Sequence, residues 1–436
     1  MNVREIALKM LLDYEESEKY INLSLASHIA DGLSSQERGQ LTSLLYTAVE
    51  HKLTYDYLIG VFTARSIDKL SPHTKNLLRL GLCQILHIAS IPDFAAVNES
   101  VRLTKNKGER GLVHAVLRRA VAEKDNLPYP DKARNAARYY SVVYSLPIKT
   151  VRHFMELLGD DECVKLFASF NESKGTTLTV NTLKITPDEL IEKLSNEGYV
   201  ATRAAFSPIS VKIHGSFDPR RSDAFSAGLM LVQDEASAIV PLALSPKAGE
   251  VLIDVCAAPG GKSMTSAILS NDGGEIYSFD LHESKLSLIR DSAKRLGLSS
   301  IKPLALDATA PKEELIGKAD KVLCDVPCSG LGVIGKKPDL RYKDIGSLNE
   351  DLPPLQLEIL EQSARYLKPS GTLTYSTCTL NRAENEDVVR AFLDKHPDFY
   401  TEDFSVGALS SEDGMLTLYP HLHGTDGFFV SKLRRK

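Results

Sequence analysis

Apolar residues recur at every third or fourth position through the first part of the chain. The spacing is clearest in three stretches: Ile6-Ala7-Met10-Leu11, Leu41-Leu44-Leu45-Ala48-Val49 and Leu77-Leu78-Leu80-Leu82-Ile85-Leu86. This period places apolar side chains on one face of a helix, and strand-like alternation is absent. Asp93 can begin a further helix, and Gly108 and Gly111 are expected to separate it from a helix over residues 112–119. The pattern predicts an all-α domain over residues 1–125.

A linker is expected after this domain, because Pro128 and Pro130 interrupt any regular element. Beyond a short helical stretch, the expected elements are a strand over residues 176–182, a helix over 187–197 and a strand over 210–214. This mixture predicts a small α+β region, RRM-like, over residues 130–237.

The pattern changes near Pro241 to short apolar runs that alternate with helical periods. The expected strands cover residues 251–255, 276–279, 303–306, 321–324 and 372–376, and the expected helices cover residues 263–269 and 283–296. Such alternation is typical of a parallel sheet covered by helices. Residues 238–436 are therefore predicted to form an α/β domain with a Rossmann-like sheet.

Composition places the chain among ordinary globular proteins. It is 43% hydrophobic and 25% charged over 436 residues, which provides enough apolar material for several buried cores. No apolar run approaches the roughly 18 residues that a membrane span needs, and residues 1–12 lack the apolar centre of a signal peptide. We expect a cytoplasmic protein without membrane association.

The net charge of −5 argues weakly against a nucleic-acid partner, but the distribution of charge argues the other way. Residues 71–140 contain twelve Lys and Arg against six Asp and Glu, a local net charge of +6. Six of these basic residues crowd a short stretch: Arg102, Lys105, Lys107, Arg110, Arg118 and Arg119. Charge alone fits a phosphate-binding patch and a solvated helix face equally well.

The first turn between strand and helix in the α/β domain is rich in small residues. Small side chains and two glycines let a ligand approach the backbone, and the next helix offers free N–H groups. The candidate ligand-binding residues of this turn are Cys256, Ala257, Ala258, Pro259, Gly260, Gly261 and Lys262. A phosphate-binding P-loop requires a glycine where this chain has Cys256, and the dinucleotide motif Gly-x-Gly-x-x-Gly is also absent.

An aspartate lies at the end of each of the next three predicted strands: Asp280, Asp307 and Asp325. Asp280 comes about twenty residues after the glycines, where a carboxylate can accept both hydroxyls of an unphosphorylated ribose. A row of carboxylates is a poor site for a triphosphate without metal ions, but it suits a cationic sulfonium nucleoside. Each acid alone can also be a helix cap, and this alternative stays open.

Six cysteines in 436 residues are too few for a disulfide framework and indicate reduced thiols. No Cys-x-x-Cys pair has a second partner, so no metal site is expected. Cys328 and Cys378 lie among Ser, Thr, Gly and Pro residues, whereas Cys83, Cys163 and Cys324 lie in apolar runs and are expected in cores.

Three motifs of the α/β domain resemble the signature motifs of the RNA cytosine-C5 methyltransferases of the Sun/Fmu/NOL family. They are Asp254 to Lys262, Asp325-Val326-Pro327-Cys328-Ser329-Gly330 and Tyr375-Ser376-Thr377-Cys378. Residues 228–237 are similar to the segment that precedes the catalytic domain in this family. The N-terminal helices resemble the RNA-binding domain of the antitermination factor NusB through residues 96–99 and 115–119. The likeness covers nearly the whole chain and points to the bacterial Sun/Fmu subgroup, which methylates 16S ribosomal RNA.

The resemblance implies a class I methyltransferase domain that uses S-adenosylmethionine. Carbon 5 of cytosine is a weak nucleophile, so a thiolate must first add to carbon 6, and Cys378 is expected to supply it. Asp325 is expected to hold the N3 edge of the base, and the resemblance assigns product release to Cys328. The implied partner is 16S rRNA or an early small-subunit assembly particle, with cytosine 967 as the target. A monomer without an obligate protein partner is expected.

Other functions stay open at this point. The chain can be an RNA-binding assembly factor without catalysis, or it can methylate a different RNA. Four basic residues after the Asp325 motif fit either an RNA-backbone contact or a solvated loop: Lys336, Lys337, Arg341 and Lys343. His114 and residues 145–148 depart from the family pattern, both outside the catalytic motifs.

Overall fold

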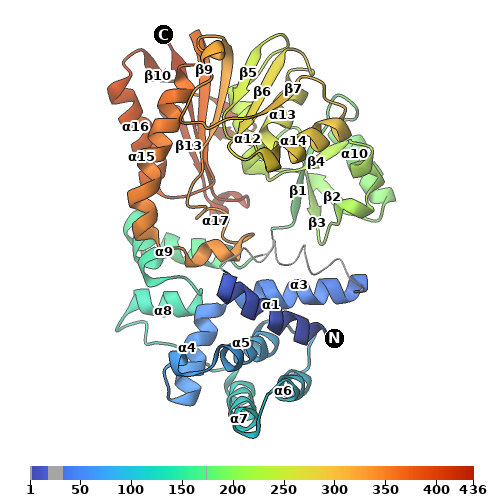
Figure 1. Ribbon diagram of the computed structural model, residues 1–436, viewed down its shortest axis with the longest axis vertical. Coiled ribbons are helices and arrows are strands. Elements are labelled where there is room, and N and C mark those ends of the chain that lie inside the picture. The colour runs from blue at the N-terminus through green and yellow to red at the C-terminus, as the bar shows by residue number, and fades with distance from the viewer. Residues whose placement is uncertain (1, 18–32, 173) are drawn as a thin grey trace. The chain divides into compact units, whose positions relative to one another are not determined.

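The computed structural model of the protein describes residues 2–17, 33–172 and 174–436 (Figure 1). The chain forms two compact units. The first contains Met1–Asn171 and Lys336–Asp344, and the second contains Glu172–Gly335 and Ile345–Lys436. The boundaries expected near residues 125–130 and 237–238 both lie inside a unit, so the contacts group the chain differently from the sequence pattern.

The first unit is helical in its described residues, which confirms the helical fold predicted for residues 1–125. Its helices are α1 (Val3–Ser17), α3 (Ser35–Glu50), α4 (Lys52–Thr63), α5 (Pro72–His87), α6 (Asp93–Arg102), α7 (Lys107–Glu123), α8 (Ala136–Val143) and α9 (Ile148–Ser169). The unit continues through α9 into the region predicted as α+β. Helix α5 is central, because it packs against α1, α3, α4, α6 and α7, and its residues 77–85 are all buried. Gly81 allows α7 to approach α5 closely, since a Cβ at this position would lie 2.6 Å from a methyl carbon of Leu117.

Helix α7 begins earlier than the sequence pattern indicates. It starts at Lys107, where the Asn106 side chain accepts a hydrogen bond from the backbone N–H of Glu109. Gly108 and Gly111 were expected to precede the helix, and that expectation is wrong because both lie inside it. The Asn106 cap supplies the start signal, and the glycines lower the helix propensity without ending the helix.

A segment from a distant part of the chain completes the first unit. Residues 336–344, which we call the strap, leave the second unit after Gly335 and return to it at Ile345. The strap carries Arg341, whose side chain is fully buried (0% exposed). Its guanidinium donates hydrogen bonds to the Glu50 carboxylate (3.2 Å), the Tyr144 carbonyl (3.1 Å), the Phe170 carbonyl (3.0 Å) and the Asn171 side chain (2.6 Å). The sequence left two possibilities for Arg341, an RNA contact and a solvated position. Its burial excludes both.

The next strap residue, Tyr342, is also held inside the first unit. Its hydroxyl donates to the carbonyl of Val49 at 2.6 Å and lies 3.0 Å from the hydroxyl of Ser145. The same Ser145 oxygen accepts the backbone N–H of Leu53 at 3.0 Å. The segment 145–148, which departs from the family pattern, thus contributes a contact to the strap.

The smaller sheet of the second unit contains β1 (Thr176–Val180), β2 (Val200–Arg203), β3 (Ser210–His214) and β4 (Met230–Val232), with helices α10 (Pro187–Asn196) and α11 (Asp223–Ser226). The strand order is β2-β3-β1-β4, and every neighbouring pair is antiparallel. One helix follows β1 and another follows β3, which is the order of the split βαβ motif and is consistent with an RRM-like region. Leu178, Val211 and Met230 lie in its core.

The larger sheet has the strand order β10-β14-β9-β8-β5-β6-β7, with β13 paired to β14. Its strands are β5 (Val251–Asp254), β6 (Glu275–Asp280), β7 (Ile301–Ala305), β8 (Ala319–Asp325), β9 (Leu367–Thr377), β10 (Phe399–Thr401), β13 (Met415–Leu418) and β14 (Phe428–Arg435). Its helices are α12 (Glu235–Leu244), α13 (Gly261–Leu269), α14 (Glu283–Leu296), α15 (Ile345–Ala364) and α16 (Glu386–Lys395). Helices α12, α13 and α14 lie on one side of the sheet, and α15 and α16 lie on the other (Figure 1). In the described ranges, no helix combines the length and apolar character that a membrane crossing requires.

The strands β5 to β9 are parallel, and β14 runs antiparallel to β9. The strand order reverses between β5 and β8, and ligands of such sheets bind at the carboxyl ends of the strands at this switch point. Asp254, Asp280 and Asp325 are the last residues of β5, β6 and β8, and Cys378 follows β9 directly. The fold therefore places the predicted site residues along one edge of one sheet.

Replacing Arg341 by alanine is expected to destabilise the first unit. The change leaves the Glu50 carboxylate without its cation, and breaking a buried ion pair costs about 3–5 kcal/mol. A thermal melt followed by circular dichroism should show the helical transition at a lower temperature. Lys337→Ala, an exposed change on the same strap, is the control and should melt like the wild type. Equal midpoints for both variants would contradict the role given to Arg341.

The buried imidazole of His51 makes the stability of the first unit depend on pH. His51 is 9% exposed and stacks on His87, and burial lowers the pKa of His51 from 6.5 to about 2. The folded unit therefore keeps His51 neutral, whereas the unfolded chain takes up a proton below about pH 6.5. The free energy of unfolding should fall by about 1.4 kcal/mol for each pH unit below that point.

Melting midpoints of the wild type and of His51→Phe, compared from about pH 7.5 to about pH 5, measure this effect. The phenyl ring keeps the aromatic contact and cannot take a proton, so the variant should lose less stability on acidification. The same loss in both proteins would show that His51 does not contribute to the pH dependence.

Candidate active site

Five of the seven candidate residues, 256–260, lie in the loop between β5 and α13, and Gly261 and Lys262 begin α13. The backbone N–H of Ala257 donates to the Phe279 carbonyl of β6 at 2.6 Å, which ties the loop to the neighbouring strand. Gly260 has a φ of 108°, a conformation that favours glycine, and a Cβ there would lie 3.3 Å from Ile289. Helix α13 begins directly afterwards, so its first N–H groups, which have no helical partner, are available to a ligand.

Asp254 anchors this loop from inside the protein. One of its carboxylate oxygens accepts the hydroxyl of Ser263 at 2.6 Å, and the hydroxyl of Ser278 donates to Ser263 at 2.8 Å. The other oxygen has no hydrogen-bond partner among the described residues. Burial raises the pKa of Asp254 to about 7. Asp254 begins one of the three signature motifs, but its role as a buried anchor was not predicted from the sequence.

Asp280 and Asp307 differ in their surroundings. Asp280 is 8% exposed, and one of its oxygens accepts the backbone N–H of His282 at 3.0 Å. We find no hydrogen bond to its second oxygen within the described part of the chain. Asp307 is exposed and accepts the backbone N–H of Thr309 at 2.9 Å, a contact that lowers the pKa of Asp307. Asp307 therefore closes a local turn with Thr309 and caps no helix, whereas Asp280 keeps an acceptor at the strand edge.

The carboxylate of Asp325 joins three elements of the domain. Lys262, in the first turn of α13, has its ammonium 2.7 Å from one Asp325 oxygen. Ser376 of β9 donates its hydroxyl to the other oxygen at 2.7 Å. The Lys262 ammonium also lies 5.0 Å from the centre of the Phe428 ring. A predicted cofactor-loop residue and a predicted catalytic residue thus form one ion pair.

Cys328 and Cys378 meet just beyond the ends of the adjacent strands β8 and β9. Their sulfur atoms are 3.1 Å apart, and both residues are partly exposed. Contact with Cys378 and burial raise the pKa of the Cys328 thiol well above its usual value. Cys328 therefore keeps its proton at neutral pH and can donate it in a hydrogen bond to the Cys378 sulfur. The structure brings the two predicted catalytic cysteines into direct contact.

Hydrogen bonds hold the two cysteine loops together on both sides of the sulfur pair. Before the sulfurs, the backbone N–H of Val326 donates to the Ser376 carbonyl at 3.1 Å. After them, the hydroxyls of Ser329 and Thr379 are 2.7 Å apart, and both side chains are buried. The position of each loop is therefore fixed by the other.

Gly332 and Gly427 allow the segment that leads into β14 to pack against these loops. The backbone N–H of Gly332 donates to the Cys378 carbonyl at 3.0 Å, and the Gly332 carbonyl accepts the N–H of Gly427 at 2.8 Å. A Cβ on Gly332 would lie only 2.0 Å from the Gly427 carbonyl oxygen. Any larger residue at Gly332 would therefore push the loop after Cys328 away from Gly427, which directly precedes β14.

Glu384 is a buried carboxylate that the sequence analysis missed. It accepts three hydrogen bonds: the backbone N–H of Ser329 at 2.8 Å, the Gln356 side chain at 3.0 Å and the Asn381 side chain at 2.9 Å. Gln356 also donates to the Pro327 carbonyl at 2.9 Å. These contacts hold the residues on both sides of Cys328. The sole signal in the sequence was the position of Glu384 shortly after the predicted nucleophile.

The remaining cysteines lie in cores or in the ligand loop. Cys83, Cys163 and Cys324 are completely buried, as predicted, and burial raises the pKa of Cys324 to about 12. Cys256 is partly exposed in the loop after β5, and burial raises the pKa of its thiol as well. Within the described ranges, no group of three His, Cys, Asp or Glu side chains could hold a metal ion.

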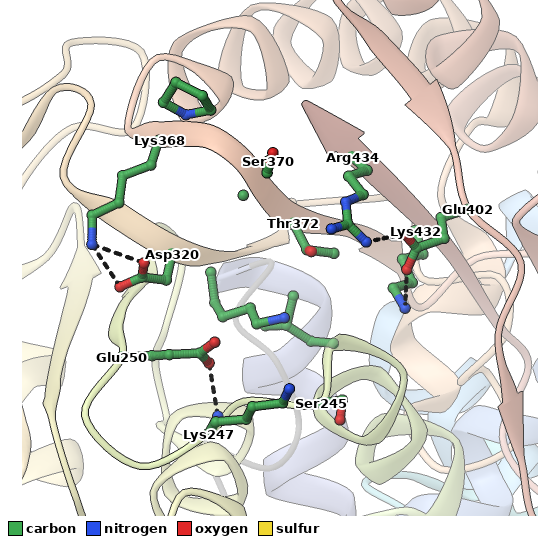
Figure 2. Close-up of a pocket in the computed structure, with 14 residues that line it drawn as sticks. Ser245, Lys247, Glu250, Asp320, Lys368, Ser370, Thr372, Glu402, Lys432 and Arg434 are labelled. Carbon is green, nitrogen blue, oxygen red and sulfur yellow. Dashed lines mark hydrogen bonds and ion pairs between the residues drawn. The ribbon is translucent and has the colours of Figure 1, made fainter. Parts of the chain in front are cut away.

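A cavity of about 470 Å³ lies at the opposite, amino-terminal edge of the sheet (Figure 2). Lys368 and Asp320 form an ion pair of 2.8 Å at its wall, and Lys432 pairs with Glu402 at 2.6 Å. None of the predicted site residues lines this cavity. The candidate active site is therefore the carboxyl edge of the sheet.

Two protein families each match a different part of the chain. Residues 241–434 match the family described as 16S rRNA methyltransferase RsmB/F, and residues 1–122 match the NusB family. The "Probable ribosomal RNA small subunit methyltransferase B" of Bacillus subtilis (strain 168) is 36% identical, over 100% of this chain and 99% of the relative. The protein of the same description from Synechocystis sp. is 34% identical, over 100% of both chains. The predicted resemblance is confirmed by these matches.

Solved structures agree with this grouping. The crystal structure of PH0851 has a TM-score of 0.77 and 30% identity, and the match covers 95% of this chain and 94% of that chain. The crystal structure of NSun6 from Pyrococcus horikoshii with SFG has a TM-score of 0.58 and 25% identity, over 65% of this chain and 97% of that chain. Sequence and structure together show that this chain belongs to the family of small-subunit ribosomal RNA methyltransferases B, with a NusB domain at its N-terminus.

Proposed function

We propose that this protein transfers a methyl group from S-adenosylmethionine to carbon 5 of a cytosine in 16S rRNA, with cytosine 967 as the target. The observation that carries the proposal is the 3.1 Å contact between the sulfurs of Cys328 and Cys378, on the two strand ends that Asp325 and Ser376 connect. Two thiols and a carboxylate at one sheet edge supply a nucleophile, a base and a hydrogen-bonding group for a pyrimidine ring.

The residues at the switch point fit a sulfonium nucleoside. Helix α13 begins at Gly261, so its first N–H groups, which have no helical partner, are available to a ligand. Asp280 offers an oxygen without a protein partner to the ribose hydroxyls. S-adenosylmethionine, when bound here, supplies a methyl group on a positively charged sulfur.

Cys378 is the proposed nucleophile. Its thiolate forms a bond to carbon 6 of a cytosine that has left its stack, and an electron pair of the ring moves toward carbon 5. Asp325 holds the N3 edge of the base. When protonated, Asp325 supplies a hydrogen to N3 as the ring gains negative charge.

Cys328 is the proposed base for product release. Contact with Cys378 is the largest cause of the raised pKa of Cys328 in the free enzyme. When the Cys378 sulfur is bonded to carbon 6, it no longer holds the Cys328 hydrogen, so Cys328 can give this proton to solvent and become a thiolate. Cys328 then takes the proton from carbon 5, the electron pair returns to the ring, and the bond between carbon 6 and Cys378 breaks.

The helical unit is proposed to hold the RNA. All six clustered basic residues on or near α6 and α7 are exposed: Arg102, Lys105, Lys107, Arg110, Arg118 and Arg119. Such a patch binds phosphates with an affinity that falls as salt rises. We expect a cytoplasmic monomer that binds 16S rRNA or an early small-subunit particle. An RNA-binding factor without catalysis would need the patch alone, and the close contact of Cys328 with Cys378 argues against it.

Two single substitutions separate the roles of the cysteines. Cys378→Ala should lower the rate of methylation at least about 10³-fold, because carbon 5 is never activated. This loss corresponds to an increase of about 4 kcal/mol in the activation barrier. In the Cys328→Ala variant, Cys378 should still attack the base and carbon 5 should still be methylated. The proton on carbon 5 then stays, and the enzyme remains covalently attached to its RNA. A denaturing gel should then show a slow band that contains protein and methylated RNA.

The double variant Cys328→Ala/Cys378→Ala is the control and should give no slow band, because the bond runs through Cys378. A band from Cys378→Ala that is absent from Cys328→Ala would reverse the two roles. If both single variants stayed active without trapping RNA, covalent catalysis would have to be abandoned. Bisulfite mapping of rRNA from cells without the protein identifies the target cytosine and distinguishes 16S rRNA from another RNA.

Asp280→Ala should weaken cofactor binding, because hydrogen bonds from the ribose to a charged acceptor are lost, each worth about 1.5–3 kcal/mol. Titration calorimetry with S-adenosylmethionine measures the change in affinity. Asp291→Ala, an exposed change on α14, is the matched control and should bind like the wild type. Wild-type affinity in Asp280→Ala would refute the ribose assignment.

A further inference from the structure

We propose that Cys328 and Cys378 form a site of reversible disulfide modification, and that peroxide closes this bond and stops methyl transfer. The proposal about the bond rests on the geometry of the two loops. The proposal about its effect rests on the roles that the proposed function gives to the two sulfurs.

The sulfur atoms are already close to bonding distance. They lie 3.1 Å apart, and a disulfide is about 2.05 Å long, so a relative movement of about 1 Å closes the bond. The loops cannot move apart easily, because Val326 bonds to Ser376 before the pair and Ser329 contacts Thr379 after it. Cys328 and Cys378 follow paired residues of the adjacent strands β8 and β9, which lets the side chains meet without a change in strand register.

Cys328 and Cys378 are two partly exposed cysteines whose sulfur atoms are in contact. Cys324 is the sequence neighbour of the site, but its side chain is completely buried in the core. Cys83 and Cys163 are also completely buried. Cys328 and Cys378 are both partly exposed, so a small oxidant can reach the pair while the three core thiols are shielded.

The reaction balances with hydrogen peroxide as the oxidant. The Cys378 thiolate attacks one peroxide oxygen, the O–O bond breaks, and a sulfenic acid and hydroxide form. The Cys328 sulfur then attacks the Cys378 sulfur, the S–O bond breaks, and the oxygen leaves as water after taking up the Cys328 proton. Two thiols and one peroxide become one disulfide and two waters. A dithiol reductant reverses the change by two thiol–disulfide exchanges.

The closed bond would disable both chemical groups together. Cys378 could not add to carbon 6, and Cys328 could not accept the proton from carbon 5. The bond would also protect Cys378, because a sulfenic acid without a neighbouring thiol is oxidised further to sulfinic acid, which a thiol does not reverse. Cys328 would then act as the resolving thiol of the site in addition to its proposed role in release.

The test uses the full-length protein, treated with hydrogen peroxide and then alkylated and digested without reductant. Mass spectrometry should find one peptide pair joined through Cys328 and Cys378, and methylation of 16S rRNA should be lost in proportion to the joined fraction. Treatment with dithiothreitol should restore both free thiols and activity. Cys163→Ala, which lacks a core cysteine outside the site, should behave like the wild type.

Cys328→Ser separates the bond from general oxidation. Without its partner, Cys378 should form sulfinic acid under the same peroxide treatment, and dithiothreitol should not restore the thiol. Absence of the joined peptide in a wild type that loses its free thiols to peroxide would overturn the proposal, as would full activity in the joined protein. A joined peptide together with no methylation by the reduced protein would instead contradict the proposed function and leave the disulfide site standing.

Discussion

The geometry of the candidate active site depends on the two hydrogen bonds that the Asp325 carboxylate accepts. One oxygen holds Lys262 at the start of α13, and the other holds Ser376 in β9. A single side chain therefore connects the cofactor loop, β8 and β9. Cys328 follows Asp325 by three residues and Cys378 follows Ser376 by two, so neither sulfur can move far while this contact persists. The Lys262 ammonium offsets the cost of holding a partly buried negative charge there.

The position of the candidate active site could be predicted from the sequence, because the carboxyl ends of parallel strands define it. Apolar runs show where the strands lie, and the carboxyl ends of parallel strands share one edge. Asp280, Asp325 and Cys378 could therefore be grouped before their coordinates were known. The antiparallel strands β13 and β14 were missed, since the buried run of residues 428–431 has no alternation that separates strand from helix.

Buried charges could not be predicted, because their partners come from distant segments. Arg341 reaches Glu50 across 291 positions of the chain, and no local pattern distinguishes it from an exposed arginine. Glu384 is similar, since a carboxylate after a catalytic strand is more often solvated than buried. Asp307 differs from these two residues, because its partner is local: it accepts a hydrogen bond from Thr309, two residues later, and closes a turn. Sequence patterns reveal periodic surfaces better than single buried polar contacts.

The strap has a consequence for how such a protein can evolve. The chain passes between its two units three times, after Asn171, after Gly335 and after Asp344. A domain joined at one point can be gained or lost through one recombination event in the gene. Loss of the helical unit here would expose Arg341 and remove its acceptors at Glu50 and Tyr144. The helical unit and the strap must therefore be inherited together, and a relative without that unit needs different residues between the loop that carries Cys328 and the helix that corresponds to α15.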